Sequence, residues 1–358
     1  MTDKNQTSIR SNTAVMCFAD GGGGMDMDAI KLALKLSPYA KTTLIAKRGA
    51  FIEKKKSQYS DKVSLRTVNS NSKLSLSFIF KIRNLITQGG IKNVVFFGTS
   101  EILSLRFAFL KKNINLIISH GTTKSTSKQD WLHRFLYKKV NYHVSISEHL
   151  HKNVEKIFPF GPHTKAELIY TSVLTQELPY IKPKKITLLH VGRIVNGKGQ
   201  TDAISACEIL EKNGIDFEFN IVGNIATDYS NEFMDFYNNC KYKNKIKLLG
   251  RFDDVFQFFE TADIFFYPSY GEGLPNSFLE AISTDISIIC YNNTVFPELG
   301  KLGFEFEMVD NLNIEDLKEK LLYMVQNLPK KRKNHNSNLA KKIFSPKVMI
   351  DKYLAILK

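Results

Sequence analysis

The stretch "DIFFYPSYGEGLPNSFLEAISTDISIICYN", Asp263 to Asn292, holds the pattern on which the fold assignment rests. Two apolar runs, "DIFFYPS" and "ISIICYN", have the length and composition of buried strands. The segment between them, "PNSFLEAIS", starts with a proline and spaces its apolar residues as a helix does. Strand, helix and strand in this order predict two parallel neighbouring strands joined by a helical crossover.

The same alternation runs along the chain in two blocks. A break near residues 172–183, where Pro179 and Pro183 flank a lysine-rich stretch, separates them. The apolar runs that indicate buried strands are "TAVMCFA", "KTTLIAK", "KNVVFFG", "NLIISHG" and "YHVSIS", then "ITLLHVGR", "FEFNIVGN", "KIKLLGR" and the two quoted above. We therefore predict an α/β chain with two parallel-sheet domains, followed by a last helix in "SPKVMIDKYLAILK".

The composition is that of a soluble globular protein. The 358 residues suffice for two domains with their own cores, and 43% of them are hydrophobic and 24% charged. No apolar run approaches the roughly 20 residues that cross a bilayer, and the polar start "MTDKNQTSIRSNT" lacks the apolar core of a secretion signal. The 4 cysteines show no CxxC and no Cys/His spacing. These features predict a protein of the reducing cytoplasm without a structural zinc.

The excess of positive charge lies entirely in the first half of the chain. The net charge is +15, and residues 1–172 hold 27 Lys and Arg against 11 Asp and Glu. Residues 173–358 hold 23 and 24, so this half is nearly neutral. Any anionic partner should therefore be met by residues 1–172.

The second block contains a glycine-rich loop with two cations, in "HVGRIVNGKGQTDAI". A strand should end just before Gly192, and Thr201 or Asp202 should cap the next helix. Arg193 and Lys198 could then converge on one anion beside the helix N-terminus. The alternative is an ordinary glycine turn with two solvated cations. The loop is not a Walker A motif, because GxxxxGK[ST] is absent.

Two carboxylates flank the turn at the start of the predicted helix. Glu272 should lie in the loop and Glu280 about one and a half turns into the helix, so that Glu272 can hold a sugar and Glu280 a ribose. The alternative is that the helix dipole alone favours these acids. The turn residues whose backbone would face the same ligand are Gly273, Leu274, Pro275 and Asn276.

Weaker signals lie at other predicted strand ends. Arg251 in "LLGRFDD" opens a loop on which a base could lie, although a surface turn explains it as well. Gly22 and Gly23 belong to a run of four glycines between a strand and a helix, where a backbone can approach a ligand closely. His120 in "ISHGTT" is either functional or structural, and Ser147 in "SISEHL" is best explained as a helix cap.

Taken together, "GRIVNGKG", "LLGRFDD" and the Glu-x7-Glu of "EGLPNSFLEAIS" resemble the second domain of GT-B glycosyltransferases of the GT4 type. The resemblance implies two Rossmann-like domains that face a cleft, with a C-terminal helix that returns to the first domain. Residues 1–172 and 345–358 would then bind the acceptor, and residues 173–344 the nucleotide-sugar donor. The resemblance implies retention of the anomeric configuration and no need for a metal, so we expect a UDP-linked donor and no cofactor.

The resemblance also assigns roles to residues. Arg193 and Lys198 would correspond to the diphosphate clamp, Glu272 to the contact with the donor sugar and Glu280 to the contact with the ribose. The residues that would line the cleft from the first domain are Gly22, Gly23 and His120. The sequence departs from the pattern at Asp285, where a glycine is usual, and in the loop at residues 292–297, which is usually rich in glycine.

The sequence thus predicts transfer of a sugar to a lipid-linked or surface glycan, with the lipopolysaccharide core or a related bacterial polysaccharide as the first candidate. The basic first half, with the aromatic segments 78–86, 106–112 and 131–142, predicts a cytoplasmic protein that rests on the anionic inner face of the cytoplasmic membrane. Two alternatives stay open: a nucleotide-sugar epimerase of the same plan, and a non-catalytic nucleic-acid-binding protein. The second lacks any RNP, KH or helix-turn-helix signature, so we expect no nucleic-acid partner.

Overall fold

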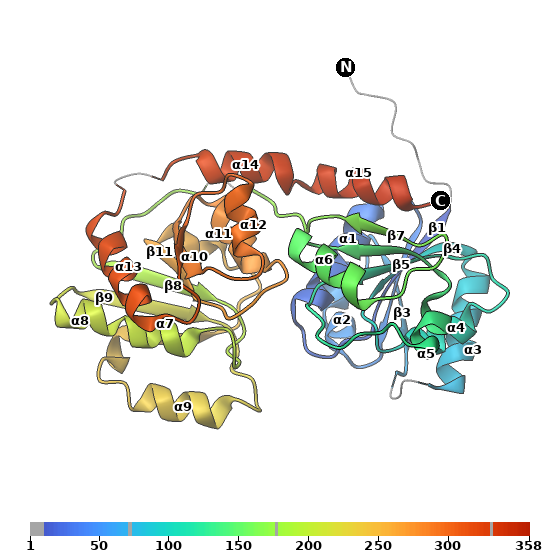
Figure 1. Cartoon of the computed structure of the whole chain (residues 1–358), viewed down its shortest axis with the longest axis horizontal. Helices are drawn as coiled ribbons and strands as arrows, with labels where there is room; N and C mark the ends of the chain where they lie inside the picture. Colours follow the sequence, from blue (N-terminus) through green and yellow to red (C-terminus); the bar gives the residue numbers. More distant parts are fainter. Residues whose placement is uncertain (1–10, 71–73, 176–177, 330–331) are drawn as a thin grey trace, which may run out of the picture. The chain divides into compact units, whose positions relative to one another are not determined.

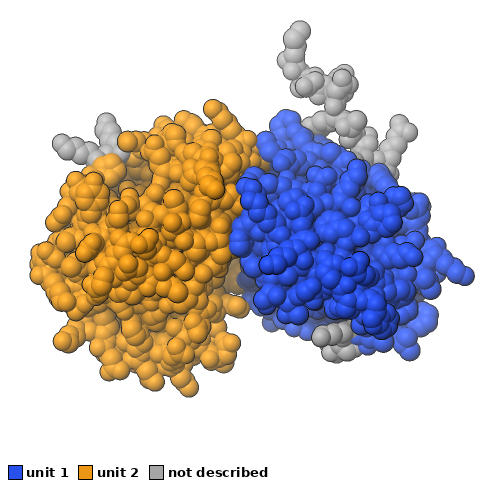
Figure 2. Space-filling view, in the orientation of Figure 1, with its two compact units in different colours: residues 1–172, 346–358 blue, residues 173–345 orange. Residues whose placement is uncertain are grey.

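The computed structural model describes residues 11–70, 74–175, 178–329 and 332–358, which form two compact units (Figure 2). Unit 1 comprises Met1–Ser172 and Pro346–Lys358, and unit 2 comprises Val173–Ser345. Each unit contains one parallel sheet with helices on both faces (Figure 1). The predicted α/β fold with two Rossmann-like sheets is confirmed, whereas the donor and acceptor roles given to the two halves stay predictions.

The sheet of unit 1 has seven strands in the order β3-β2-β1-β4-β5-β6-β7. Their bounds are β1 (Asn12–Cys17), β2 (Thr42–Lys47), β3 (Ser64–Val68), β4 (Ile91–Phe97), β5 (Asn115–His120), β6 (Val140–Ser145) and β7 (Lys165–Leu168). The chain order reverses between β1 and β4, which pair in parallel. In open α/β sheets, the carboxyl ends of two such strands border the crevice in which ligands bind.

Alternate residues of the unit 1 strands enter two apolar cores. On β1, Ala14 and Met16 pack with α3, α4, α5 and α6, whereas Val15 and Cys17 pack with α1, α2 and α15. This alternation follows from the two-residue period of a strand. The helices are α1 (Gly24–Leu36), α2 (Phe51–Lys54), α3 (Leu76–Gln88), α4 (Ile102–Ala108), α5 (Trp131–Tyr137), α6 (Glu148–Ile157) and α15 (Pro346–Ile356), with a 3₁₀ turn at Lys56–Gln58.

The C-terminal helix α15 returns to unit 1, as predicted (Figure 1). Its apolar side chains, among them Ile350 and Tyr353, belong to the core formed with α1. Beyond the apolar contacts, the amide of Asn115 donates to the carbonyl of Ile356 at 2.8 Å, and the amide of Asn93 donates to the carbonyl of Lys358 at 2.9 Å. Asn115 therefore satisfies a carbonyl in the last turn of α15 that has no partner within the helix, and Asn93 binds the segment that follows.

The sheet of unit 2 has six parallel strands in the order β10-β9-β8-β11-β12-β13. Their bounds are β8 (Ile186–Val191), β9 (Phe217–Val222), β10 (Ile246–Gly250), β11 (Ile264–Tyr267), β12 (Ser287–Tyr291) and β13 (Glu307–Val309). The helices are α7 (Gln200–Ala206), α8 (Glu208–Lys212), α9 (Ser230–Asn238), α10 (Phe256–Glu260), α11 (Asn276–Ser283), α12 (Phe296–Lys301), α13 (Ile314–Gln326) and α14 (His335–Ile343), with a 3₁₀ turn at Lys243–Lys245. Here the order reverses between β8 and β11.

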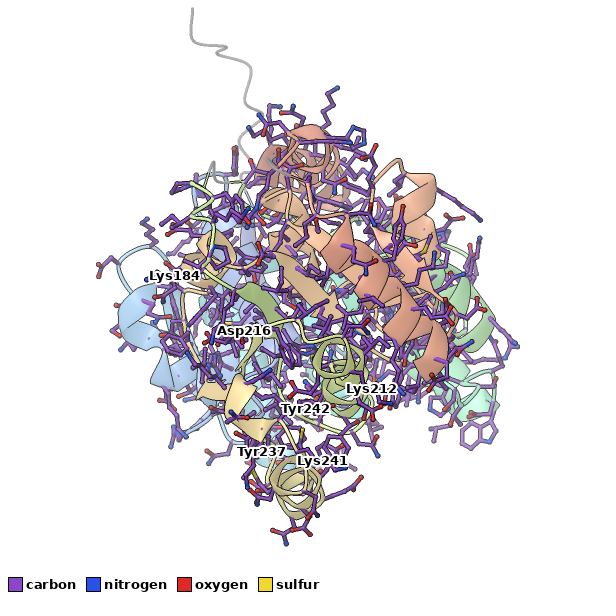
Figure 3. The ribbon with its side chains drawn as sticks, turned by 90° about the vertical axis from the view of Figure 1, so that its left-hand side faces the viewer. Lys184, Lys212, Asp216, Tyr237, Lys241 and Tyr242 are labelled. Atoms are coloured by element: carbon purple, nitrogen blue, oxygen red, sulfur yellow. The ribbon has the colours of Figure 1, made fainter. Side chains whose placement is uncertain are left out.

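Tyr242, labelled in Figure 3, connects the segment after α9 to α7 and β9. Its hydroxyl donates to the carbonyl of Ile204 in α7 at 2.8 Å, and its ring lies edge-on to Phe217 at 6.0 Å. Lys184 and Lys241, labelled in the same view, are exposed on this side of the unit.

Two predictions about helix caps have opposite outcomes. Ser147 caps α6 as predicted, because its hydroxyl accepts from the backbone N–H of Leu150 at 3.3 Å. The prediction that Thr201 or Asp202 caps α7 is wrong, since the N-cap is Gly199. The carboxylate of Asp202 instead accepts from two tyrosine hydroxyls, and both bonds fasten neighbouring segments to α7.

Asp285, which stands where the resemblance leads one to expect a glycine, has a structural role. Its φ of 53° is in the left-handed region that favours glycine, and Asp is one of the few other residues that tolerate it. Its carboxylate accepts from the backbone N–H of Ser337, at 3.2 Å, in the first turn of α14. The side chain thus caps a helix that packs on α11.

We expect Asp285→Ala to destabilise unit 2 by about 1–2 kcal/mol, because it removes the cap and leaves a β-carbon at positive φ. Asp285→Gly should cost less, because glycine adopts this φ without strain. Thermal unfolding of both variants measures the difference. Equal losses would show that backbone strain plays no part at this position.

Candidate functional site

The carboxylate of Glu272 is the centre of a polar cluster at the end of β11. Its Oε1 accepts from Lys198 Nζ at 2.5 Å, from the Tyr267 hydroxyl at 2.8 Å and from the Ser269 hydroxyl at 2.7 Å. The Glu272 side chain is only 9% exposed. A carboxylate this buried needs partners for its charge, and here it has one cation and two hydroxyls. The structure thus brings together two residues that the sequence assigned to different parts of a ligand.

The loop at residues 292–297 holds the Glu272 segment in place. The hydroxyl of Thr294 accepts from the backbone N–H of Glu272 at 2.9 Å. The amide of Asn293 donates to the carbonyl of Ser269, also at 2.9 Å. This loop departs from the glycine-rich pattern, but its polar side chains supply bonds that fix the position of the glutamate backbone.

The loop after β8 reaches Glu272 because two glycines allow backbones to touch. A β-carbon on Gly199, which has a φ of 73°, would lie 1.8 Å from the carbonyl oxygen of Pro268. A β-carbon on Gly223 would lie 1.9 Å from the carbonyl oxygen of Gly192. Both distances are far below any non-bonded contact, so side chains are excluded at these positions. The close approach at Gly199 places Lys198 against the loop that carries Glu272.

A buried histidine fixes the backbone near Arg193. His190 Nδ1 lies 2.9 Å from the carbonyl of Phe266, and its Nε2 lies 3.1 Å from the amide nitrogen of Gln200. The same amide nitrogen donates to the carbonyl of Arg193 at 3.1 Å. Burial lowers the pKa of His190 to about 3, so the ring is neutral, donates through Nδ1 and accepts through Nε2. The side chain of Arg193 is exposed on the same loop as Lys198.

The remaining predicted residues of unit 2 lie at the ends of α11 and β10. Helix α11 begins at Asn276, with Pro275 as its N-cap, so the proline stands one residue outside the helix in which it was predicted. Leu274 is buried, Gly273 is half-buried, and Glu280 is half-buried on the second turn. Arg251 directly follows Gly250, the last residue of β10, and is exposed. The structure neither adds to nor removes the roles predicted for these residues.

Unit 1 contains a cavity of about 180 Å³ at the carboxyl ends of β1, β4 and β5. This is where the order of the unit 1 strands reverses, and therefore where a ligand is expected. The lining combines apolar side chains with hydroxyls, an imidazole, a carboxyl and an ammonium group. Its polar residues are Thr99, Ser100, Glu101, Ser119, His120, Thr122 and Lys124.

His120 lines this cavity as a neutral ring. Its Nε2 lies 2.8 Å from Nδ1 of His143, and Nε2 of His143 is buried without any partner. A buried N–H without an acceptor is rarer than an unused acceptor, which places the shared proton on His143 Nδ1 and leaves His120 protonated at its own Nδ1. Burial, and then the neighbouring His143, lower the pKa of His120 well below its usual value. His120 can therefore donate a hydrogen bond but does not act as a cation.

The glycine run contributes less to the cavity than the sequence suggested. Gly22, with a φ of 61°, and Gly23 form the turn into α1, but the residues of this segment that line the cavity are Ala19 and Met25. The backbone N–H of Gly23 donates to the carboxylate of Asp26 at 3.2 Å, in a capping arrangement.

Sequence reasoning missed the residues that hold the predicted ones. Tyr267 and Ser269 stand five and three positions before Glu272, and this spacing in "YPSYGE" was an available signal. Gln200 and Thr294 were not identifiable, because their contacts depend on loops that meet only in the folded unit. Glu101, whose pKa is raised by burial, also escaped notice, as it lies in an ordinary strand-to-helix turn.

Two further observations concern the part of the chain that the structure describes. It holds no group of three or more His, Cys, Asp or Glu side chains arranged to bind a metal ion. None of its helices combines the length and the apolar character that crossing a membrane requires.

Comparison with known proteins finds a family match within the second unit. Residues 177–342 match the family described as Glycosyl transferases group 1. The chain is 26% identical over 257 residues to the capsular polysaccharide biosynthesis glycosyltransferase CapH of Staphylococcus aureus. This aligned region covers 65% of this chain and 70% of CapH. It is 23% identical over 274 residues to the N,N'-diacetylbacillosaminyl-diphospho-undecaprenol alpha-1,3-N-acetylgalactosaminyltransferase of Campylobacter jejuni. This aligned region covers 76% of this chain and 66% of that enzyme.

A solved structure shows the same fold over nearly the whole chain. Anabaena HepE in complex with UDP and glucose matches with a TM-score of 0.80 and 13% identity, covering 97% of this chain and 99% of HepE. At this identity the likeness concerns the fold, and it supports the predicted GT-B architecture.

The buried histidines predict how stability depends on pH. Burial lowers the pKa of His143 and of His190 to about 3, whereas histidine in an unfolded chain titrates near 6.5. Their contribution is therefore fully present above pH 6.5 and is lost as the pH falls, because the unfolded chain then binds protons that the folded chain does not. Between pH 7 and 5.5, protonation of each of these histidines in the unfolded chain should lower the free energy of unfolding by about 1 kcal/mol. Thermal unfolding across this range measures the loss.

The variant His143→Leu isolates the contribution of one ring. Its stability should fall less steeply between pH 7 and 5.5 than that of the unmodified chain, whatever its stability at pH 7. His163 is exposed, so His163→Asn is the matched control and should keep the original slope. An unchanged slope in His143→Leu would contradict the assignment of a neutral buried ring.

Proposed function

The chain is a glycosyltransferase whose residues 177–342 form a group 1 domain, and on that premise we propose that it is a retaining enzyme that uses a UDP-linked sugar. The acceptor is a hydroxyl of a lipid-linked or surface glycan, with the lipopolysaccharide core or a related bacterial polysaccharide as the first candidate. The observation that carries this proposal is the Lys198–Glu272 contact beside β8 and β11, where the strand order of unit 2 reverses. The UDP in the HepE complex supports the choice of nucleotide.

The contacts of Glu272 suggest how the site changes when the donor binds. Lys198 is 29% exposed and flexible enough to turn toward a diphosphate, where Arg193 supplies a second positive charge. When Lys198 leaves, the hydroxyls of Tyr267 and Ser269 still hold the carboxylate of Glu272. Glu272 then accepts hydrogen bonds from the hydroxyls of the donor sugar, and Glu280 accepts from those of the ribose.

The proposed reaction uses charge stabilisation and no protein nucleophile. The bond between the anomeric carbon and the diphosphate oxygen breaks, and the bond to the acceptor oxygen forms on the same face of the sugar. The proton of the acceptor hydroxyl passes to an oxygen of the departing diphosphate. Lys198 and Arg193 stabilise the negative charge that develops on that group, which is where preorganised cations act most strongly. We propose that no metal ion is required.

The cavity of unit 1 supports a saccharide acceptor. Hydroxyls, a carboxyl and a neutral imidazole donor beside apolar side chains are the groups that bind sugars. The names of the S. aureus and C. jejuni relatives refer to capsule synthesis and to a diphospho-undecaprenol substrate, which supports a surface glycan and a lipid-linked acceptor. Together with the excess of basic residues in residues 1–172, they support a location at the cytoplasmic face of a membrane.

Replacing either cation of the clamp should slow transfer strongly. We expect Lys198→Ala and Arg193→Ala each to lower the turnover number by roughly two orders of magnitude, because each loses a contact that strengthens as the diphosphate departs. Release of UDP in the presence of acceptor, measured in excess EDTA, reports the rate. The exposed Lys184→Ala is a matched control that should keep full activity.

Two outcomes of this assay would overturn parts of the proposal. Normal turnover in Lys198→Ala would refute the role of Lys198 in binding the diphosphate. Restoration by manganese of an activity lost in EDTA would show that a metal is needed. UDP-sugar consumed without an acceptor, with the sugar converted to its epimer, would favour the epimerase.

The two glutamates should differ in what they bind. We expect Glu280→Gln to weaken the binding of free UDP, because the ribose loses a charged acceptor. Glu272→Gln should spare UDP affinity and depress transfer, because its partner is the sugar. Isothermal titration calorimetry with UDP separates the two roles. Equal weakening by both variants would refute this division.

A further inference from the structure

Unit 1 exposes large apolar side chains over one continuous group of helices. Trp131 is 79% exposed, Leu76 71% and Phe80 65%, although large apolar residues are normally buried. Every exposed large apolar side chain among the described residues of unit 1 lies in or beside α3, α4 and α5. We call this set the α3–α5 surface: Leu74, Leu76, Phe80, Phe107, Leu110, Trp131, Leu132 and Phe135.

These residues are outside the core for a geometric reason. Leu76 and Phe80 are four positions apart on α3, as are Trp131 and Phe135 on α5, so each pair lies on one helix face. The core positions between them are filled by other residues, such as Phe78, which is only 3% exposed. The three helices thus have an apolar inner face that builds the core and a second apolar face that meets solvent.

The three helices are fastened to one another by arginines. Helix α3 packs on α4, and α4 packs on α5 (Figure 1). Arg83 of α3 donates to the carbonyl of Leu110, just after α4, at 2.9 Å. Arg106 of α4 donates to the carbonyl of Phe135 on α5 at 3.3 Å, and its guanidinium lies 4.7 Å from the centre of the Phe135 ring. The exposed side chains therefore share one fixed surface.

The charge within these three helices has one sign. None of α3, α4 and α5 contains an Asp or a Glu. Asp130, just before α5, accepts from the backbone N–H groups of Leu132 and His133, so it acts as the cap of that helix. The basic residues on or beside the three helices are Lys81, Arg83, Arg106, Lys111, Lys112, Arg134, Lys138 and Lys139.

We propose that the α3–α5 surface docks on an anionic lipid bilayer, with Trp131, Phe80 and Leu76 inserted at the boundary between headgroups and acyl chains. Lysines and arginines beside inserted aromatic and aliphatic side chains are what an anionic bilayer surface binds. A neutral protein surface would satisfy the apolar residues but not the cations, and a nucleic acid would satisfy the cations but not the aliphatic side chains. This inference rests on the proposed function, and it names the part of unit 1 that meets the membrane.

The chain carries its own probe, because Trp131 is its single tryptophan. In buffer we expect the emission of a solvent-exposed indole. Vesicles of phosphatidylglycerol and phosphatidylcholine should shift the emission to shorter wavelength, and lipids brominated on the acyl chains should quench it. Phosphatidylcholine alone should do neither, and about 0.5 M salt should reverse most of the binding.

Two pairs of charge reversals provide a matched test. Lys138→Glu with Lys139→Glu should weaken partition into the anionic vesicles at least tenfold. Lys184→Glu with Lys241→Glu makes the same change in net charge on unit 2, at exposed positions shown in Figure 3, and should change partition less than twofold. Leu76→Ser with Phe80→Ser should weaken partition while leaving the net charge unchanged. All six side chains are exposed, so thermal unfolding should be unaffected.

Several results would overturn the proposal. They are equal partition into neutral and anionic vesicles, no partition into either, and equal weakening by the two pairs of reversals. A dimer in sedimentation equilibrium, with Trp131 emission already at short wavelength in buffer, would show that a second copy of the chain covers the surface instead. The binding test uses no sugar donor, so vesicle binding without transfer would count only against the proposed enzyme. Transfer to a soluble acceptor without vesicle binding would count only against this surface.

Discussion

The close approach of two backbones at Gly199 determines the geometry of the unit 2 site. A side chain at this position would collide with the carbonyl of Pro268, so the loop after β8 can meet the end of β11 only through a glycine. The contact places Lys198 beside Glu272, and the short hydrogen bonds of that carboxylate then fix the segment that leads into α11. A cation and a carboxylate from distant parts of the sequence thus become one site because of a steric constraint on a residue with no side chain.

The sequence predicted the central strands of both sheets and missed others for one physical reason. The missed strands are β3, β7 and β13, and each is the outermost strand at an edge of its sheet. Edge strands are short and carry polar side chains on exposed positions, as in "SLRTV" and "KAEL", so they lack the continuous apolar run of a buried parallel strand. The fold class survived these omissions because the order of helices and central strands already defines it.

The candidate site was predictable to the extent that its residues are close in sequence. The spacing from Glu272 to Glu280 and the cations of the glycine loop stand in local motifs, whereas the support from Thr294 and Gln200 comes from other loops. The departures from the family pattern show the same limit. Asp285 lies in the region of the predicted site, but it serves α14 as a cap, which only the path of the chain after residue 332 reveals.

The cations of α3, α4 and α5 are not neutralised by neighbouring carboxylates, and this argues for an external anion. Elsewhere in the chain lysines do pair with acids, as in the contacts of Glu218 with Lys185 and Lys247 in unit 2. In unit 1 none of the lysines and arginines within α3, α4 and α5 pairs with a carboxylate among the described residues. Neighbouring like charges repel one another and reduce stability, and exposed aromatic residues gain nothing from water. An anionic bilayer would offset both costs, because its headgroups neutralise the cations and its acyl chains take up the aromatic residues.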